Sequence, residues 1–185
     1  MNVVGLDLSL TATGVATDAG TETLRTDLRG CDRLAWIRDA ILPACGCWHN
    51  SEGWNPDPHD ARLADLVVLE DYAYSRANQA HQIGELHGVI RLALHEAGIP
   101  VALVAPTARA KYATGKGNAG KAEVLAAAIR RLGYDGHDDN EADALWLRQM
   151  AIDHYGLTEP SAPMPAVNRA ALDKVDWPEI GGDRA

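Results

Sequence analysis

The chain has 185 residues and a formal net charge of −9, with 26 acidic and 17 basic side chains. This length suits one domain with a substantial core and is short for two. The negative charge argues against a protein that coats nucleic acid through overall charge alone, although basic residues gather between positions 109 and 131. We therefore expect one domain at residues 1–156, followed by a C-terminal extension at residues 157–185.

The N-terminus and the cysteines bear on the compartment. The opening stretch MNVVGLDLSL has no basic leader, and no segment approaches about 18 consecutive apolar residues. Three cysteines are an odd number that does not suit a disulfide framework. Cys45, Cys47 and His49 could hold part of a zinc site, but no fourth ligand is evident. We expect a cytoplasmic protein that does not enter a membrane.

The first third of the chain predicts strands and then a helix. Apolar and alternating patterns predict three successive strands, which implies an antiparallel beginning: Val3–Leu8, Thr13–Thr17 and Glu22–Leu28. Residues 33–42 have apolar side chains at helical spacing, and Pro43 is expected to stop that helix. Residues 45–59, rich in Gly, Pro, Asn and Trp, are predicted to be a loop.

Strands then alternate with helices. Leu66–Glu70 and Val101–Val104 are short apolar runs typical of buried strands, and residues 78–97 between them predict a long helix. A short helix after Pro106, a glycine-rich loop, a helix at residues 121–132 and another containing Asp143 follow. Residues after about 157 predict an extension with one short helix at residues 169–175. This order predicts an α/β domain with a mixed sheet.

Four carboxylates stand close together in HDDNEADALW, residues 137–146. A helix start explains Asp138 or Asp139, and Glu141, because acids there cap free N–H groups and suit the helix dipole. Asp143 lies beyond the first turn and between alanines. A carboxylate in such a setting is usually paired, hydrogen-bonded or bound to a metal.

Two more carboxylates interrupt predicted buried strands. Asp7 lies in the first strand and Glu70 ends the strand at 66–70, where each is costly unless compensated. If these strands are neighbours, both carboxylates can approach Asp143. Mg²⁺ or Mn²⁺ would then offset their repulsion, since both are hard cations that prefer oxygen ligands.

In this order the motifs resemble the RuvC family of Holliday junction resolvases. The matching stretches are GLDLS at 5–9 with Gly14, VLE at 68–70, GELHG at 84–88, Lys111, GNAGKAEV at 117–124 and EADAL at 141–145. The resemblance covers about residues 1–155, and residues 45–59 and the extension lie outside it. It implies an RNase H-like fold with a mixed five-stranded sheet, three antiparallel strands and then two parallel ones, flanked by helices. It also implies a homodimer that cuts branched DNA in a bacterial or phage-infected cell.

The resemblance assigns roles to the acidic residues and to one lysine. Two Mg²⁺ ions per active site, with Mn²⁺ able to substitute, would be held by Asp7, Glu70 and Asp143. Asp139 or Asn140 would be the fourth group, and we favour Asp139 because an amide oxygen is a weaker magnesium ligand than a carboxylate. Lys121 would neutralise a phosphate or developing charge, although a solvated lysine in a first helical turn is an equal alternative.

Basic and aromatic residues near these motifs are candidates for DNA contact. Tyrosines flank the position at which bacterial relatives carry an aromatic residue, and either ring could stack on an unpaired base. A tyrosine after a strand is, however, more often a packing residue. The candidates are Lys111, Lys116, Lys121, Tyr72, Tyr74 and Arg76.

Two other classes of protein share some of these features. The opening G-x-D-x-S-x-x-x-x-G also resembles the first phosphate loop of sugar kinases and actin-like ATPases, but those chains carry a second nucleotide-binding half. The glycine-rich loop at 115–120 lacks the full phosphate-loop pattern, so we expect no nucleotide cofactor. A junction-binding protein without catalysis would gain nothing from keeping Asp7, Glu70 and Asp143 together.

Overall fold

The computed structural model describes residues 1–50, 53–56, 63–72, 77–157 and 163–180. Its main sheet has five strands in the order β3-β2-β1-β6-β7. The strands are β1 (Val3–Asp7), β2 (Ala12–Ala16), β3 (Thr21–Arg25), β6 (Leu66–Glu70) and β7 (Val101–Val104). The pairs β1–β2 and β2–β3 are antiparallel, while β1–β6 and β6–β7 are parallel. The predicted mixed α/β sheet is therefore confirmed.

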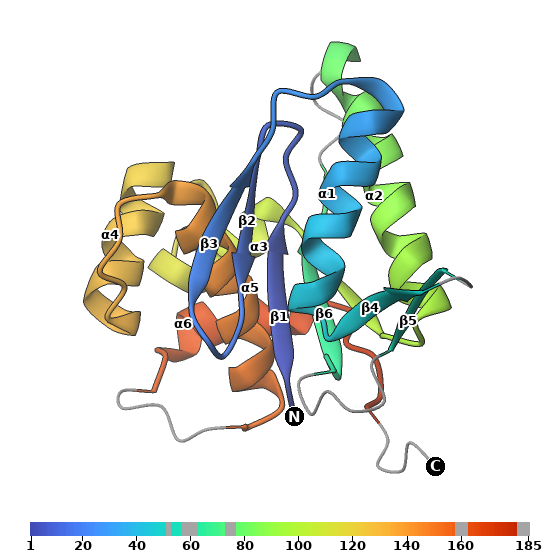
Figure 1. The fold of residues 1–185 in the computed structure, drawn as a ribbon. Coiled ribbons are helices and arrows are strands. Elements are labelled where there is room, and N and C mark those ends of the chain that lie inside the picture. The colour runs from blue at the N-terminus through green and yellow to red at the C-terminus, as the bar shows by residue number, and fades with distance from the viewer. Residues whose placement is uncertain (51–52, 57–62, 73–76, 158–162, 181–185) are drawn as a thin grey trace.

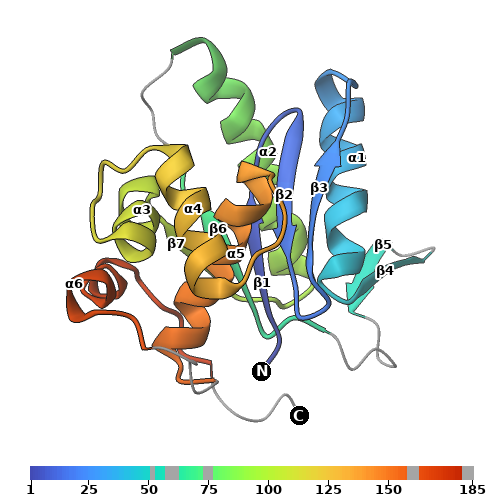
Figure 2. The same ribbon diagram turned by 90° about the vertical axis from the view of Figure 1, so that its left-hand side faces the viewer.

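Helices cover both faces of this sheet (Figures 1 and 2). On one face lie α1 (Gly30–Ala44) and α2 (Ala77–Glu96). On the other lie α3 (Pro106–Thr114), α4 (Lys121–Leu132) and α5 (Asp139–His154). Two hydrophobic cores result, one on each side of the sheet, and side chains alternate between them along β1: Val3 joins the α5 side, whereas Val4 and Leu6 join the α1–α2 side.

Helix α5 contacts the sheet backbone to backbone. A Cβ atom added at Gly5 would lie 2.1 Å from the carbonyl oxygen of Ala144, and one added at Gly14 would lie 2.1 Å from that of Asn140. Only glycine at both positions allows α5 to cross β1 and β2 this closely. The same contact fixes where the side chains of α5 stand relative to the end of β1.

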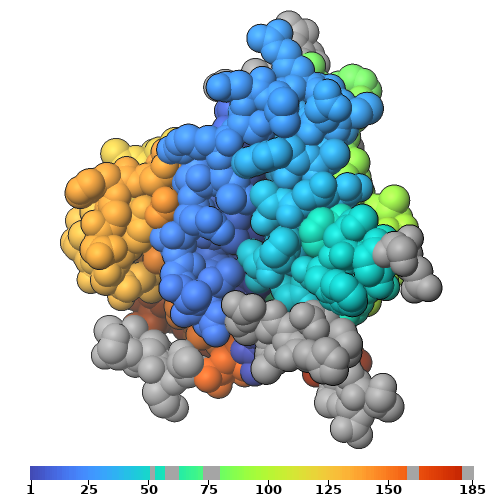
Figure 3. Space-filling model, viewed as in Figure 1, coloured from blue at the N-terminus to red at the C-terminus, as the bar shows by residue number. Residues whose placement is uncertain are grey.

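The edge strand β3 is tied to α5 through polar groups. The hydroxyl of Thr21 donates to Glu141, and Arg25 pairs with Asp138. Figure 3 shows β3 at the surface, between the α4–α5 side and α1. Its partly exposed side chains fit an edge position.

Two local predictions were wrong. Pro43 does not stop α1 but lies inside its last turn, where only one helical hydrogen bond is lost and the fixed φ of proline suits the helix. Residues 45–59 were predicted to be a loop, but in the described part of this range β4 (Cys47–Asn50) pairs with β5 (Gly53–Pro56), while 51–52 and 57–59 lie outside the described residues. The rings of His49 and Trp54 meet edge to face across these two strands, with centroids 5.3 Å apart.

Part of the C-terminal extension packs on the domain. Residues 163–180 include α6 (Ala166–Arg169) and a 3₁₀ turn at Leu172–Lys174, where one helix at 169–175 was predicted. Met164, Leu172 and Val175 join the core beneath α3, α4 and α5. The division of the chain at residue 156 stays a prediction.

No helix in the ranges that the structure describes is long and apolar enough to cross a membrane.

Candidate active site

The ends of β1 and β6 bring two acidic side chains together. The parallel register pairs Leu6 with Leu69, so Asp7 and Glu70 follow at corresponding positions of neighbouring strands. Alternation along each strand turns both toward the face that α5 covers, where Gly5 and Val68 also lie. This is the neighbourhood that the sequence predicts.

Asp143 completes the acidic group from α5. Its side chain is 2% exposed, and it lies on the helix that passes directly over Gly5 and Gly14. Burial and the neighbouring carboxylates of Glu70 and Asp143 raise the pKa of Asp7 well above its usual range. Burial also raises the pKa of Asp143 to about 6, although Arg109 opposes this rise. The three carboxylates therefore repel one another at a place where Asp143 is buried and Asp7 and Glu70 are half-buried.

Arg109 lies among these carboxylates. It comes from the first half of α3, is 7% exposed, and donates from Nε to Glu70 and from an Nη group to Asp143. Burial disfavours its charge, but Glu70 and Asp143 outweigh burial and raise the pKa of the guanidinium. In the sequence Arg109 is only the first of the basic residues between positions 109 and 131, so its place in the site was missed.

A second cation stands at the edge of the cluster. Lys121, at the start of α4, pairs with Asp139, and this hydrogen bond raises the pKa of the lysine. Both side chains are partly exposed. The charge of Lys121 also acts on Asp7 and Asp143, so it belongs to the same electrostatic unit. The role of Lys121 toward a phosphate or developing charge stays a prediction.

The acidic residues at the start of α5 have two different kinds of contact. Asp138 is the N-cap and accepts from the backbone N–H groups of Asn140 and Glu141. The side-chain amide of Asn140 also donates to Asp138, at 3.0 Å, while Glu141 accepts from Thr21 and from Tyr134. Asp139 turns instead toward Lys121. Of the two candidates for a fourth group, Asp139 pairs with Lys121 and Asn140 with the N-cap Asp138, and the choice between them stays a prediction.

The other candidates for DNA contact lie farther out or pack locally. Lys116 is exposed and stands 3.7 Å from Glu123, and Lys111 is half-buried on α3. The ring of Tyr72 packs against His87 of α2, with centroids 5.0 Å apart, as in the packing alternative. Tyr74 and Arg76 lie outside the described residues.

The donor set suits a divalent cation in its chemistry. Four carboxylates, Asp7, Glu70, Asp139 and Asp143, are hard oxygen donors, and the repulsion among the buried ones is what a cation relieves. The spacing of these groups, however, is not that of a metal site. In the ranges that the structure describes, no three acidic, His or Cys side chains are grouped closely enough to hold a metal ion. A guanidinium, not a metal site, joins Glu70 and Asp143 in this arrangement.

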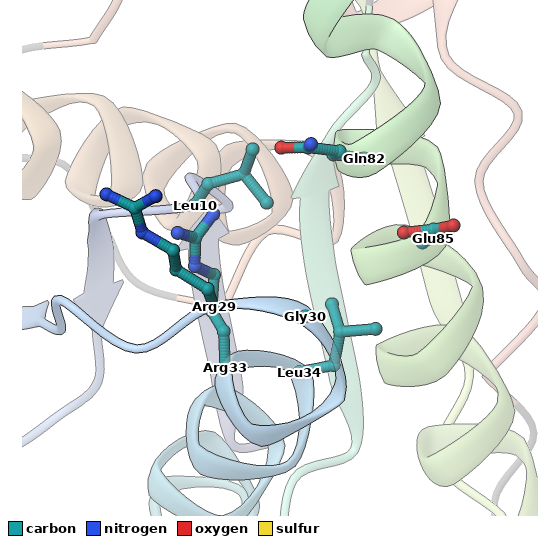
Figure 4. A pocket seen from close by; sticks show the side chains of 7 residues that line it. All are labelled: Leu10, Arg29, Gly30, Arg33, Leu34, Gln82 and Glu85. Carbon is teal, nitrogen blue, oxygen red and sulfur yellow. The ribbon is translucent and has the colours of Figure 1, made fainter.

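An open polar pocket lies between the N-terminal parts of α1 and α2. Its volume is about 270 Å³, and Leu10 of the loop after β1 also lines it. Arg29 and Arg33 stand on one side and Gln82 and Glu85 on the other (Figure 4). The guanidinium groups give this part of an acidic protein local positive charge.

The sheet order, with acidic residues at the ends of its two central strands, defines an RNase H-like α/β fold. Comparison with solved structures shows which proteins of this fold the chain resembles. RuvC of Thermus thermophilus matches with a TM-score of 0.62 and 23% identity over 86% of this chain and 99% of that one. T. thermophilus RuvC in complex with a Holliday junction substrate gives a TM-score of 0.63 and 22% identity over the same shares.

One curated relative supports this likeness in sequence. The crossover junction endodeoxyribonuclease RuvC of Anaeromyxobacter dehalogenans (strain 2CP-C) is 32% identical over 111 residues, which are 60% of this chain and 58% of that protein. The match thus spans less than two thirds of the relative's length. No protein-family model matches the chain. The chain has the RuvC fold and is RuvC-like in sequence.

Proposed function

We propose that the protein is a metal-dependent, structure-selective DNA endonuclease that cleaves four-way junctions or related branched DNA. One observation carries this proposal: carboxylates from β1, β6 and α5, half-buried at Asp7 and Glu70 and buried at Asp143, converge at one end of the sheet, where burial and then their mutual repulsion raise the pKa of Asp7 and Asp143. Such a costly arrangement is expected where cations and a phosphate are bound. The names of the RuvC proteins above, one of them solved with a Holliday junction, supply the substrate class.

The acidic residues divide the chemistry among them. Asp7, Glu70, Asp139 and Asp143 would hold two Mg²⁺ or Mn²⁺ ions, which supply an activated water and stabilise the departing oxygen of the phosphodiester. Lys121 stands beside Asp139 with most of its side chain exposed, so it can reach a phosphate oxygen. Lys116 and Lys111 are further basic candidates for contact with the DNA backbone.

Two strands cut symmetrically need two active sites, which a two-fold dimer supplies. We propose that α2 forms the dimer contact. Gly88 of α2 has open space where a side chain would begin, and Leu92, one turn farther, is 58% exposed. These residues line one groove together with Arg91, His95, Ile99, Pro100 and Val101. Branched DNA in the cytoplasm of a bacterial or phage-infected cell would be the substrate.

The test is nicking of a four-way junction and of a linear duplex in Mg²⁺, with ATP hydrolysis measured alongside. We expect the wild type to cut the junction preferentially. We expect Asp7→Asn to abolish cleavage and to retain junction binding, because it removes a metal ligand and also lowers repulsion toward phosphate. Near-normal nicking by that variant would refute the metal-nuclease proposal.

The rival classes predict other results. ATP hydrolysis without nicking would favour an actin-like or sugar-kinase-like phosphate site. Junction binding without nicking by the wild type in Mg²⁺ or Mn²⁺ would favour a binding protein without catalysis.

A further inference from the structure

Arg109 is a buried cation whose charge its own helix does not stabilise. It lies near the N-terminus of α3, at which the helix dipole disfavours a cation, and it is buried. No acidic residue stands in the first turn of that helix to offset the dipole. Its stabilising contacts come from Glu70 and Asp143, which belong to other elements. The arginine is therefore held by the acidic cluster and not by its own helix.

The guanidinium takes up the carboxylate oxygens that a metal would need. Nε contacts one oxygen of Glu70, and an Nη group contacts one oxygen of Asp143. Asp7 has no hydrogen bond or ion pair within the described part of the chain, and its carboxylate feels the charges of both Arg109 and Lys121. Arg109 thus compensates Glu70 and Asp143 directly and Asp7 at longer range.

We propose that Arg109 is an internal counter-ion, which holds the acidic cluster together without metal and must leave Glu70 and Asp143 when a divalent cation binds. This inference rests on the metal site of the proposed function. Arg109 and the metal compete for the same oxygens, so the arginine stabilises the metal-free protein and weakens metal binding. Arg109 is a positioning residue in this role, since it acts through the carboxylates.

Competition of this kind has a measurable size. An opposite charge in contact with a carboxylate typically shifts its pKa by one to three units, a factor of about 10 to 1000 in its proton-binding constant. Removing Arg109 should therefore raise the affinity for the metal by a factor of this size. The displaced guanidinium also needs another anion, and the DNA phosphate is the anion at hand, so metal and DNA are expected to bind cooperatively.

The experiment titrates Mn²⁺ into the DNA-free protein by calorimetry and compares Arg109→Gln with the wild type. We expect the variant to bind Mn²⁺ at least about tenfold more tightly. Without metal we expect it to melt at a lower temperature, and with saturating Mn²⁺ to recover most of that loss. Arg148→Gln is the matched control, because Arg148 is half-buried on α5 and donates to the carbonyl of Val3, away from the acids. Its metal affinity should equal that of the wild type.

A second measurement uses the wild type, in case Arg109→Gln does not fold. The Nε–H signal of Arg109 in an ¹⁵N spectrum should show a protected, hydrogen-bonded proton without metal and lose that protection when Mg²⁺ saturates the site. Equal or weaker Mn²⁺ binding by Arg109→Gln, or a signal that stays protected at saturation, would overturn the role of Arg109 and leave the nuclease intact. Absence of metal binding by every variant would overturn both.

Discussion

The two faces of the sheet are built in different ways. On the α5 side, Gly5 and Gly14 bring helix and strand backbones into contact, and the charged residues of the site lie at the end of that contact. On the α1–α2 side, large apolar side chains such as Leu6, Leu86 and Ile90 separate the layers. Side-chain packing can adjust by changes of rotamer, whereas backbone contact cannot. The face that carries the chemistry is the less adjustable one.

The strongest test of this difference is one added methyl group. Gly5→Ala puts a Cβ atom 2.1 Å from the carbonyl oxygen of Ala144, so α5 must move. We expect a loss above about 3 kcal/mol in the free energy of unfolding, at the upper end for overpacking, and loss of cleavage. On the other face, Ile90→Leu keeps the volume and should cost less than about 1.5 kcal/mol. Urea unfolding measures both, and equal costs would contradict the comparison.

The start of α5 can be tested for the fourth group of the site. Asp139 contacts Lys121, whereas Asn140 is held by the N-cap Asp138. Asp139→Asn should reduce cleavage on the order of 100-fold or raise the magnesium requirement, as is typical when a group of the metal environment is lost. Asn140→Ala should do less. Junction cleavage across a magnesium titration compares them, and the reverse order would assign the role to Asn140.

His87 of α2 is an acid-sensitive group on the α1–α2 side of the sheet. Burial lowers the pKa of His87 from 6.5 to about 4, so between these values the unfolded chain binds the proton more readily than the folded protein. Stability from this residue is present above pH 6.5 and lost as the pH falls toward 4, by about 3 kcal/mol. His87→Gln should flatten this part of the stability profile. An unchanged slope between pH 4 and 6.5 would show that His87 does not titrate in this way.

The smallest effect is expected at the outer surface of α2. Leu92 is 58% exposed beside Gly88, and Leu92→Glu puts a charge into the proposed dimer contact. We expect the dimer dissociation constant to rise about tenfold. Ile129→Glu on α4 is the control, since Ile129 is also exposed, at 43%, and lies on the opposite side. Sedimentation should show a weaker dimer only for Leu92→Glu, and a monomeric wild type at micromolar concentration would contradict the assembly.

The sheet was predictable because its strands are short apolar runs whose order admits few topologies. The acids were predictable because Asp7 and Glu70 interrupt those runs. The pairing of β4 with β5 was missed because the Gly, Pro and Asn content of these residues is that of a loop. The contact of His49 with Trp54 across the strands favours the pairing despite this composition.

Arg109 was missed for a different reason. Several basic residues surround it, and spacing alone does not show which one turns inward, since that depends on where α3 meets the sheet. A signal was nevertheless present. Arg109 stands between Ala108 and Ala110, just as Asp143 stands between Ala142 and Ala144, and all four alanines are buried. A charge flanked by small buried residues marked both partners of the ion pair.

Residues 163–180 of the extension contact α3, the helix that carries Arg109, from outside the sheet. The amide of Asn168 donates to the carbonyl of Tyr112 at 2.6 Å, near the end of α3, and Arg169 and Tyr112 both reach Asp153 of α5. Near the end of α5, the hydroxyl of Tyr155 donates to Pro178. The segment 163–180 therefore acts as a clasp that links α3 to α5, the two helices joined at the site by Arg109 and Asp143. A fusion partner inserted before this clasp would disturb the acidic cluster from a distance, whereas one attached after residue 180 would leave it in place.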